Sequence, residues 1–221
     1  MDKAKNVLWT GGWDSTFRVI QLYQRGLTLQ PIYVIDPSRS STQKEIETIK
    51  LLTNQIQLRF KNSDEKILPV KLIKRKDIRS NLYLKVIYKL IKRKRRIGTQ
   101  YKWLAYLAKQ YSGLEQGLHK EDRDCLFYYN ELKEITDETG GKNWVIDRKK
   151  IDFLRSQLFK NIRFPLMYIS KLEMKSYAEK HGFLDIMNNT WFCHKSNEKP
   201  CGKCGPCKQY VVDGFGYRLE G

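Results

Sequence analysis

Short apolar runs alternate with longer amphipathic segments along the first third of the chain. The runs 6–9 and 31–36 are apolar enough to be buried strands. The segments that begin at Ser15 and Thr42 place apolar residues at helical spacing. Strand, helix, strand, helix is the order of a parallel sheet with right-handed crossovers. The pattern therefore predicts an α/β fold.

The remaining segments continue this order, and several helix ends carry capping signals. Thr42 is expected to cap its helix, with Glu45 completing a capping box, and Ser170 with Glu173 predicts a second box. Gly182 stands where a helix typically ends. We further expect strands at 68–73 and 114–118, helices at 77–96, 98–111, 151–159 and 171–181, and an extended link at 163–166, whereas residues 126–147 match no clear pattern.

A pair of glycines separates the first predicted strand from the first helix. Gly11 and Gly12 allow positive φ and close approach of a ligand to the backbone. A helix start offers N–H groups and the positive end of its dipole to an anion, and the hydroxyls of Ser15 and Thr16 add donors for phosphate oxygens. Taken alone, the stretch favours a tight turn in which Asp14 or Ser15 caps the helix, and a phosphate-binding loop is the alternative.

Length and composition favour a globular protein. A chain of 221 residues with 41% hydrophobic residues can bury a sizeable core. No apolar run approaches the ~20 residues of a membrane span, so no membrane partner is expected. The first residues lead straight into a strand and do not resemble a signal peptide, which favours a cytoplasmic location.

The formal net charge of +18 is concentrated in one part of the sequence. Residues 66–96 hold 13 Lys and Arg against one acid, Asp77, which gives +12 for this stretch. Such a field attracts nucleic acids and nucleotides. The alternative is a solvated helix with cations on its exposed face, since Tyr83 and Tyr88 are the aromatic residues within the stretch.

Four of the five cysteines are crowded near the C-terminus. Cys193, Cys201, Cys204 and Cys207 have spacings that can close a tetrahedral zinc site with no open position for chemistry. An iron–sulfur cluster and a redox pair are the alternatives. His194 is not needed as a ligand.

The two ends of the chain together resemble one enzyme family. The stretch Thr10-Gly11-Gly12-Trp13-Asp14-Ser15 resembles the Ser-Gly-Gly-x-Asp-Ser loop of the ATP pyrophosphatases, or PP-loop enzymes, which cleave ATP between its α- and β-phosphates. Cys193 and the run Cys201-Gly202-Lys203-Cys204-Gly205-Pro206-Cys207 resemble the zinc motif of one branch, the 7-cyano-7-deazaguanine synthases. The segment 165–173 is similar to the helix that precedes this motif.

The resemblance implies a fold, a reaction and cofactors. The fold is a Rossmann-like (adenine nucleotide alpha hydrolase-like) parallel sheet flanked by helices, with a PP-loop ATP-binding domain over residues 1–182 and a small zinc-binding tail with four cysteines over 183–221. The reaction is that of an ATP-dependent C–N ligase of queuosine biosynthesis: a carboxylate, 7-carboxy-7-deazaguanine or a related acceptor, is adenylated with release of pyrophosphate, and ammonia or an amine then displaces AMP. ATP as substrate, Mg²⁺, structural zinc and a homodimer complete the expectation.

The same resemblance assigns site residues. Asp14, Ser15 and Lys171 are the expected catalytic residues; Asp14 either contacts Mg²⁺ or fixes the loop, and Lys171 either contacts phosphate or is a solvated residue at a helix start. ATP is expected against Thr10, Gly11, Gly12, Trp13, Asp14, Ser15, Thr16, Val34 and Arg39, the acceptor against Gly117, His119 and Asp122, and the metal against Cys193, Cys201, Cys204 and Cys207.

The middle of the chain departs from the family pattern. In the stretch 117–125, Gly117 and Asp122 keep the spacing of the family's substrate loop, but His119 replaces an Asn and a Tyr-Pro pair is absent. His119 could equally be a surface loop histidine, and Asp122 a cap or a solvated acid. The sequence therefore does not identify the acceptor. It also does not say whether the amine is ammonia or a group on a nucleic acid or a protein. The alternatives are a PP-loop enzyme that modifies tRNA or DNA through residues 66–96, and a zinc-containing binding module without activity.

Overall fold

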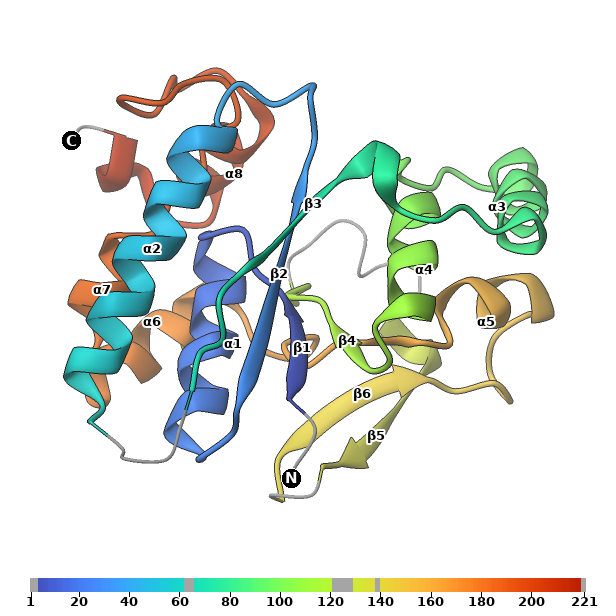
Figure 1. Ribbon diagram of the computed structural model, residues 1–221, viewed down its shortest axis with the longest axis horizontal. Helices are drawn as coiled ribbons and strands as arrows, with labels where there is room; N and C mark the ends of the chain where they lie inside the picture. Colours follow the sequence, from blue (N-terminus) through green and yellow to red (C-terminus); the bar gives the residue numbers. More distant parts are fainter. Residues whose placement is uncertain (1–3, 62–65, 121–128, 138–139, 220–221) are drawn as a thin grey trace.

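One five-stranded parallel sheet organises the protein (Figure 1). The computed structural model describes residues 4–61, 66–120, 129–137 and 140–219. The strand order is β3-β2-β1-β4-β7, and β5 and β6 form a separate antiparallel hairpin. The strands are β1 (Lys5–Leu8), β2 (Leu29–Ile35), β3 (Lys71–Lys74), β4 (Leu114–Glu115), β5 (Leu132–Thr136), β6 (Lys142–Ile146) and β7 (Ile162–Arg163).

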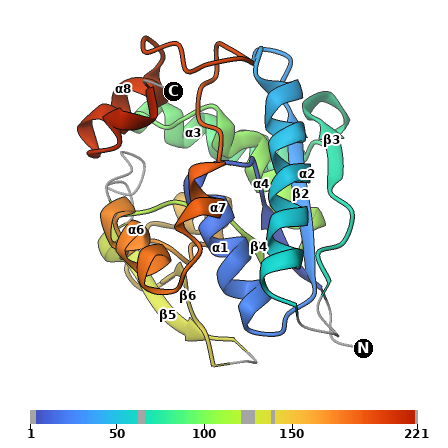
Figure 2. The same ribbon diagram turned by 90° about the vertical axis from the view of Figure 1, so that its left-hand side faces the viewer.

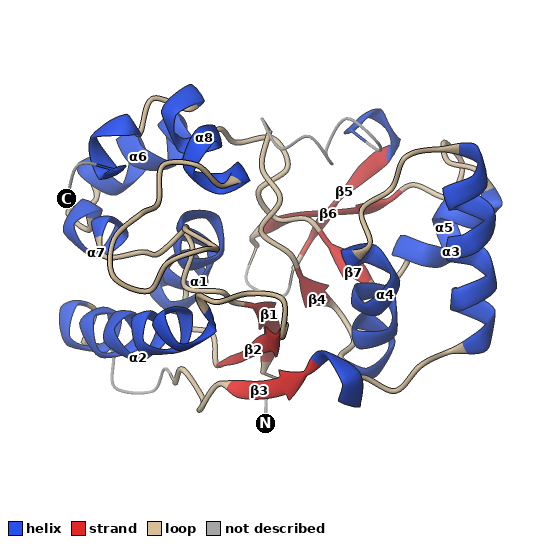
Figure 3. Ribbon diagram, turned by 90° about the horizontal axis from the view of Figure 1, so that it is seen from above, coloured by secondary structure: helices blue, strands red, loops and turns tan. Residues whose placement is uncertain are grey.

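Helices cover both faces of this sheet, as the view from above in Figure 3 shows. α1, α2, α6 and α7 lie on one side, and α3, α4 and α5 lie on the other. The predicted Rossmann-like α/β fold is thereby confirmed. The helices are α1 (Trp13–Gln24), α2 (Thr42–Arg59), α3 (Leu82–Lys94), α4 (Gln100–Gln110), α5 (Phe153–Phe159), α6 (Lys171–Lys180), α7 (Leu184–Asn188) and α8 (Gly205–Val212), with 3-10 helices at Arg75–Asp77, Tyr129–Glu131 and Gly216–Leu219.

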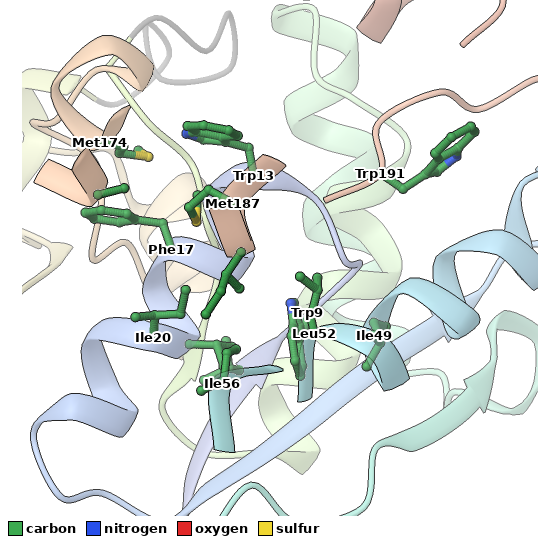
Figure 4. Close-up of a cluster of buried hydrophobic side chains, with 14 of the residues drawn as sticks. Trp9, Trp13, Phe17, Ile20, Ile49, Leu52, Ile56, Met174, Met187 and Trp191 are labelled. Atoms are coloured by element: carbon green, nitrogen blue, oxygen red, sulfur yellow. The ribbon is translucent and has the colours of Figure 1, made fainter. Parts of the chain in front are cut away.

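Two hydrophobic cores, one on each face of the sheet, hold these layers together. Successive side chains of a strand point to opposite faces, so Tyr33 of β2 enters one core and Ile32 and Val34 enter the other. Trp9 and Phe17, both fully buried, lie in the first core together with residues of α2, α6 and α7 (Figure 4). The segment that follows β1 is therefore anchored by the burial of Trp9 and Phe17 in this core.

The predicted elements agree with the structure except at several ends. The capping box of Ser170 and Glu173 is present, and Gly182 follows α6 with φ of +69°, as expected. The cap predicted at Thr42 is wrong, because Thr42 is already helical and Ser41 is the N-cap, its hydroxyl donating to Glu45 Oε1 at 2.6 Å.

The basic helix is also shorter than predicted. It begins at Leu82 rather than at residue 77, because the Asn81 side chain caps it by accepting a hydrogen bond from Leu84 N. The predicted link 163–166 begins inside β7, the edge strand of the sheet, and the unassigned residues 126–147 contain the β5–β6 hairpin. Among the described residues, no helix is both long and apolar enough to cross a bilayer.

Candidate functional site

The loop between β1 and α1 lies at the carboxyl edge of the sheet, where open α/β folds bind ligands. We call residues 10–15 the glycine loop. Gly11 has φ of +71°, and a Cβ there would lie 3.2 Å from Thr48 Cγ2 and 3.3 Å from the Glu45 carbonyl of α2. Gly12 is the N-cap of α1 and supplies no side chain to the helix start. No capping side chain from Gly12 occupies the N–H groups in the first turn of α1, so they can bind an anion.

The two hydroxyls that follow the glycines have different positions. Ser15 Oγ donates to the Gly12 carbonyl at 3.3 Å and accepts from Thr10 N at 3.4 Å, so it belongs to the loop. Thr16 is fully buried, and its Oγ1 accepts a hydrogen bond of 2.9 Å from the indole N–H of Trp9. Thr16 therefore supports the loop from the core side.

Two cavities open on either side of the glycine loop. The strand cavity, of about 220 Å³, lies over the ends of β1, β2 and β4. The tail cavity, of about 660 Å³, lies toward the C-terminal residues. Thr10, Gly12 and Asp14 line both. The loop is therefore a shared wall, and ligands in the two cavities would meet at it.

The strand cavity contains most of the residues expected at the nucleotide. Val34 and Asp36 line it from the end of β2, and Arg39 lines it from the following loop. Gly117 closes it from the other side, where a Cβ would lie only 3.1 Å from the backbone N of Ser15. Gln116 also lines it, and its buried Oε1 accepts no hydrogen bond within the described residues. This amide is a site residue that the sequence did not indicate.

Arg39 is oriented by a buried carboxylate beneath the loop. Its Nη1 lies 3.7 Å from Glu45 Oε2, and Tyr33 OH donates to the same oxygen at 2.8 Å. Burial and the neighbouring Glu45 charge raise the pKa of Tyr33, which keeps the phenol protonated as a donor. The Arg39 side chain is 31% exposed and lines the strand cavity.

The tail cavity gathers the other charged candidates. His119 Nε2 lies 4.0 Å from Asp14 Oδ2, and Lys171 Nζ lies 2.7 Å from Asp213 Oδ2 and 4.8 Å from the centre of the Tyr210 ring. Burial alone would lower the pKa of Lys171, but the charge of Asp14 and the contact with Asp213 raise it overall. Lys171 is therefore a buried, fully charged ammonium group next to the loop.

The structure thus places most of the predicted site residues at one or other of the two cavities. Asp14, His119 and Lys171 come together at the tail cavity, and Ser15, Val34, Arg39 and Gly117 at the strand cavity. Trp13 is buried, lines the tail cavity and packs edge-on against Phe215 at 4.8 Å. Asp122 and Cys125 lie outside the described residues.

The four C-terminal cysteines form one cluster, as the spacing predicts. Their sulfurs all lie within 4.8 Å of one another, with Cys204 Sγ 3.3 Å from Cys207 Sγ and 4.0 Å from Cys193 Sγ. Four ligands at ~2.3 Å from a tetrahedral zinc ion are about 3.8 Å apart, which these distances match. Backbone N–H groups of Lys203 and Cys204 lower the pKa of Cys201 to about 6. The donor set fits a metal such as zinc, and His194 is not part of it.

The segment that leads into the cysteines packs directly on the glycine loop (Figure 2). Trp191 N donates to the Gly11 carbonyl at 2.9 Å, and the Ser40 hydroxyl donates to the His194 carbonyl at 3.2 Å. Burial and the nearby Arg39 lower the pKa of His194 to about 4, so this imidazole is neutral at pH 7. The segment that carries the first cysteine of the cluster is therefore in direct contact with the glycine loop.

A buried ion pair that sequence reasoning missed supports the opposite side of the loop. Arg18 of α1 donates to both carboxylate oxygens of Glu115 at 2.7 and 3.0 Å, and Asn143 Nδ2 donates to Glu115 Oε1 at 2.6 Å. Glu115 directly precedes Gln116 and Gly117, so this network fixes the strand end that closes the strand cavity. A charged residue inside the apolar run Phe17-Arg18-Val19-Ile20 was the signal in the sequence.

Comparison with known proteins agrees with the resemblance in the C-terminal part. Residues 153–215, from α5 to the residues after α8, match the family model described as queuosine biosynthesis protein QueC. The resemblance to 7-cyano-7-deazaguanine synthases is thereby confirmed. No curated protein sequence matches the chain.

A solved structure is also similar to the chain. Its title is "The crystal structure of predicted subunit of tRNA methyltransferase from Methanocaldococcus jannaschii DSM". It is 21% identical in sequence, with a TM-score of 0.43, and the match covers 80% of this chain and 75% of that one.

Proposed function

We propose that the chain is an ATP-dependent C–N ligase of the 7-cyano-7-deazaguanine synthase type. The family match supports the broader assignment, a PP-loop enzyme that uses ATP and is related to queuosine biosynthesis. One observation carries the finer proposal: the strand cavity and the tail cavity share Thr10, Gly12 and Asp14. A nucleotide on one side of the loop and an acceptor on the other would meet where the phosphates lie.

The strand cavity is the proposed ATP site. The adenosine would lie over Val34 and Asp36, and the phosphates would bind the N–H groups at the start of α1 together with Ser15 Oγ. Gly11 and Gly12 keep side chains away from this path. Arg39 would neutralise phosphate charge, and Thr16 would stabilise the loop through Trp9 without touching the nucleotide.

Asp14 is the proposed Mg²⁺ residue. Its Oδ1 is buried and accepts no hydrogen bond within the described part of the chain, although the carboxyl stands at the common wall of both cavities. A carboxylate at the wall of a phosphate site fits a hard cation that prefers oxygen ligands. When bound, Mg²⁺ would neutralise phosphate charge at this point.

The tail cavity is the proposed acceptor site. An acceptor carboxylate oxygen would attack the α-phosphorus, forming one O–P bond as the bond to pyrophosphate breaks. An amine nitrogen would then attack the acyl carbon, lose a proton and expel AMP. Lys171 would stabilise the negative charge that develops at the phosphorus, and His119 would position the acceptor. Gly117, which the resemblance assigned to the acceptor, lines the strand cavity instead. Positioning and charge neutralisation are the main requirements of such a transfer.

Residues 183–221 are the proposed zinc-binding unit beside an ATP-binding domain of residues 1–182. Four thiolates would fill a tetrahedral zinc ion, so its role would be structural. The homodimer that the resemblance implies is also part of the proposal, and light scattering on the purified protein tests it.

Product analysis tests the reaction. The zinc-loaded protein is incubated with ATP, Mg²⁺, ammonium and 7-carboxy-7-deazaguanine, and AMP, pyrophosphate, the amide and the nitrile are measured by mass spectrometry. The nitrile requires a second ATP: the amide oxygen would attack its α-phosphorus as pyrophosphate leaves, and loss of AMP and of the two N–H protons would then form the nitrile. We expect acceptor-dependent AMP formation that Asp14→Asn abolishes and Lys180→Gln, on the exposed side of α6, leaves unchanged. Absence of pyrophosphate release with every carboxylated deazapurine tried would refute the ligase assignment.

A further inference from the structure

A third cavity, of about 600 Å³, is lined by residues that follow β3 and by residues of α3 and α4, the two helices on the right of Figure 1. We call it the basic cavity. Three cations line it, Arg75, Lys92 and Lys102. Three aromatic residues, Tyr88, Trp103 and Tyr106, line it as well. Cations for phosphates and flat rings for bases are the combination that binds single-stranded nucleic acids.

One residue that lines this cavity carries a buried hydroxyl without a hydrogen-bond partner among the described residues. Tyr106 is 6% exposed, and its OH makes no hydrogen bond within the described residues. Tyr88, on the neighbouring helix, directs its own OH to the Gly98 carbonyl at 3.5 Å. A buried, unsatisfied hydroxyl destabilises the folded protein, so a ligand that bonds to Tyr106 would remove this penalty.

The basic cavity borders the basic stretch of residues 66–96, from which Arg75 and Lys92 line it. All 13 Lys and Arg side chains of residues 66–96 are exposed, and Asp77 is the acid among them. Tyr88 of the cavity belongs to this stretch, and the other two aromatic residues, Trp103 and Tyr106, come from α4, which follows it in the sequence. Folding therefore brings together the charged and the aromatic halves of one surface.

The basic cavity also adjoins the strand cavity. Trp103 lines both of them. Arg75 of the basic cavity forms an ion pair of 2.7 Å with Asp36, which lines the strand cavity. A ligand in the basic cavity would therefore lie next to the proposed ATP site, because the Trp103 side chain lines both cavities.

We propose that the basic cavity binds an unpaired nucleotide of a single-stranded nucleic acid, with the base stacked on Trp103 and the flanking phosphates along the cations of α3. The base must be unpaired, because a base inside a duplex cannot enter a cavity between two helices. Both RNA and DNA supply the base and the phosphates that this binding requires. The experiment below compares the two. The proposal is independent of the ligase reaction, because its test contains no ATP and no acceptor.

Fluorescence anisotropy with labelled 12-residue single-stranded RNA and DNA of the same base sequence tests the proposal. We expect binding that weakens with salt. The double variant Lys92→Gln/Lys102→Gln should weaken it about tenfold and make the salt slope shallower by about 1–2. Trp103→Leu should weaken it by roughly 5- to 100-fold through loss of stacking. Tighter binding of the RNA probe or of the DNA probe identifies which of the two nucleic acids is the natural ligand class.

Tyr106→Phe gives the sharpest result. It should weaken binding by about 3- to 10-fold while leaving thermal stability equal or higher, because it removes an unsatisfied hydroxyl and no packing. The matched control is Lys50→Gln/Lys180→Gln, which removes two exposed cations from α2 and α6 on the other side of the sheet.

Two outcomes would overturn the proposal. If the control pair weakens binding as much as Lys92→Gln/Lys102→Gln while Trp103→Leu and Tyr106→Phe have no effect, the nucleic acid adheres through net charge alone. If duplex DNA of the same length binds as tightly as the single strand, no unpaired base enters the cavity.

Discussion

The backbone N–H of Trp191 donates a hydrogen bond of 2.9 Å to the carbonyl oxygen of Gly11. Two residues later the chain reaches Cys193, whose sulfur belongs to the cysteine cluster. Lys44 of α2 lies 5.3 Å from the centre of the Trp191 ring and holds the segment from the other side. The geometry of the glycine loop is therefore tied to the order of the tail.

Removal of the metal should disturb the glycine loop. Cys204→Ser breaks a four-thiolate site, and we expect loss of bound zinc, a lower unfolding temperature and faster hydrogen exchange of Trp191 N–H. The loss in stability should be below the about 10–16 kcal/mol of structural zinc in small peptides, because stacking of Phe192 on Tyr210 at 3.8 Å also holds the tail. Metal analysis and hydrogen-exchange mass spectrometry measure these effects.

Lys199→Ser is the control for the metal experiment. This lysine is exposed in the same segment and has no sulfur to lose. It should keep one zinc per chain and unchanged exchange at Trp191. A Cys204→Ser protein that still bound one zinc ion tightly would show that the cluster is not a four-thiolate site.

A methyl group at Gly117 should damage the proposed ATP site. Its Cβ would lie 3.1 Å from Ser15 N and 3.3 Å from the Asp14 carbonyl carbon, both of them backbone atoms of the helix start. Gly117→Ala should lower the free energy of unfolding by about 1–3 kcal/mol and weaken ATP binding at least tenfold, measured by urea unfolding and calorimetry. Gly216→Ala meets no atom within 4 Å and should change neither quantity. Equal ATP affinity in both variants would contradict the assignment of the strand cavity.

Local signals made part of this site predictable from the sequence. The glycine pair, the Ser170 capping box and the cysteine spacing each depend on residues close together in the chain. Each motif acts through an effect that spans only a few residues. Glycine frees the backbone locally, a capping side chain reaches the next helical turn, and closely spaced cysteines can bind one metal ion. Such features can be predicted from the sequence because contacts with distant segments do little to change them.

Features that join distant segments were not predictable in the same way. Arg18 and Glu115 are 97 residues apart, and β7 contributes only two residues to the sheet. Trp103 and Tyr106 reach the basic cavity because α4 packs beside α3, a contact between helices that the sequence did not indicate. The helix start expected at residue 77 was misplaced because an Asn81 cap outweighed the apolar spacing.

The titration of Asp36 should depend on Arg75. Burial alone would raise the pKa of Asp36, but hydrogen bonds from Ser38 and the Arg75 charge lower it overall. A depressed carboxyl pKa contributes stability above the unfolded value of about 4, and this contribution is lost as pH falls through the folded value. Arg75→Gln should therefore raise the pKa of Asp36 in carboxyl-carbon NMR, and Lys76→Gln, its exposed neighbour, should leave it unchanged.

The buried pair of Arg18 and Glu115 should be far more sensitive than the exposed pair of Arg59 and Asp185. The side chains of the first pair are 5% and 3% exposed, and those of the second are 43% and 62% exposed. Glu115→Ala leaves a buried guanidinium without its carboxylate, so we expect a loss of about 3–5 kcal/mol in the free energy of unfolding. Asp185→Ala should cost at most about 1 kcal/mol, because water already solvates that pair. Urea unfolding of both variants measures the difference.

The same pair should also affect the strand cavity. Glu115 precedes Gln116 and Gly117, so loss of its contacts with Arg18 frees the strand end that closes this cavity. The double variant Arg18→Met/Glu115→Leu removes both charges and should recover much of the stability lost in Glu115→Ala. It should not recover ATP affinity fully, because the hydrogen bond from Asn143 to residue 115 is also gone. Similar stability losses for Glu115→Ala and Asp185→Ala would mean that the buried pair does not hold this edge of the site.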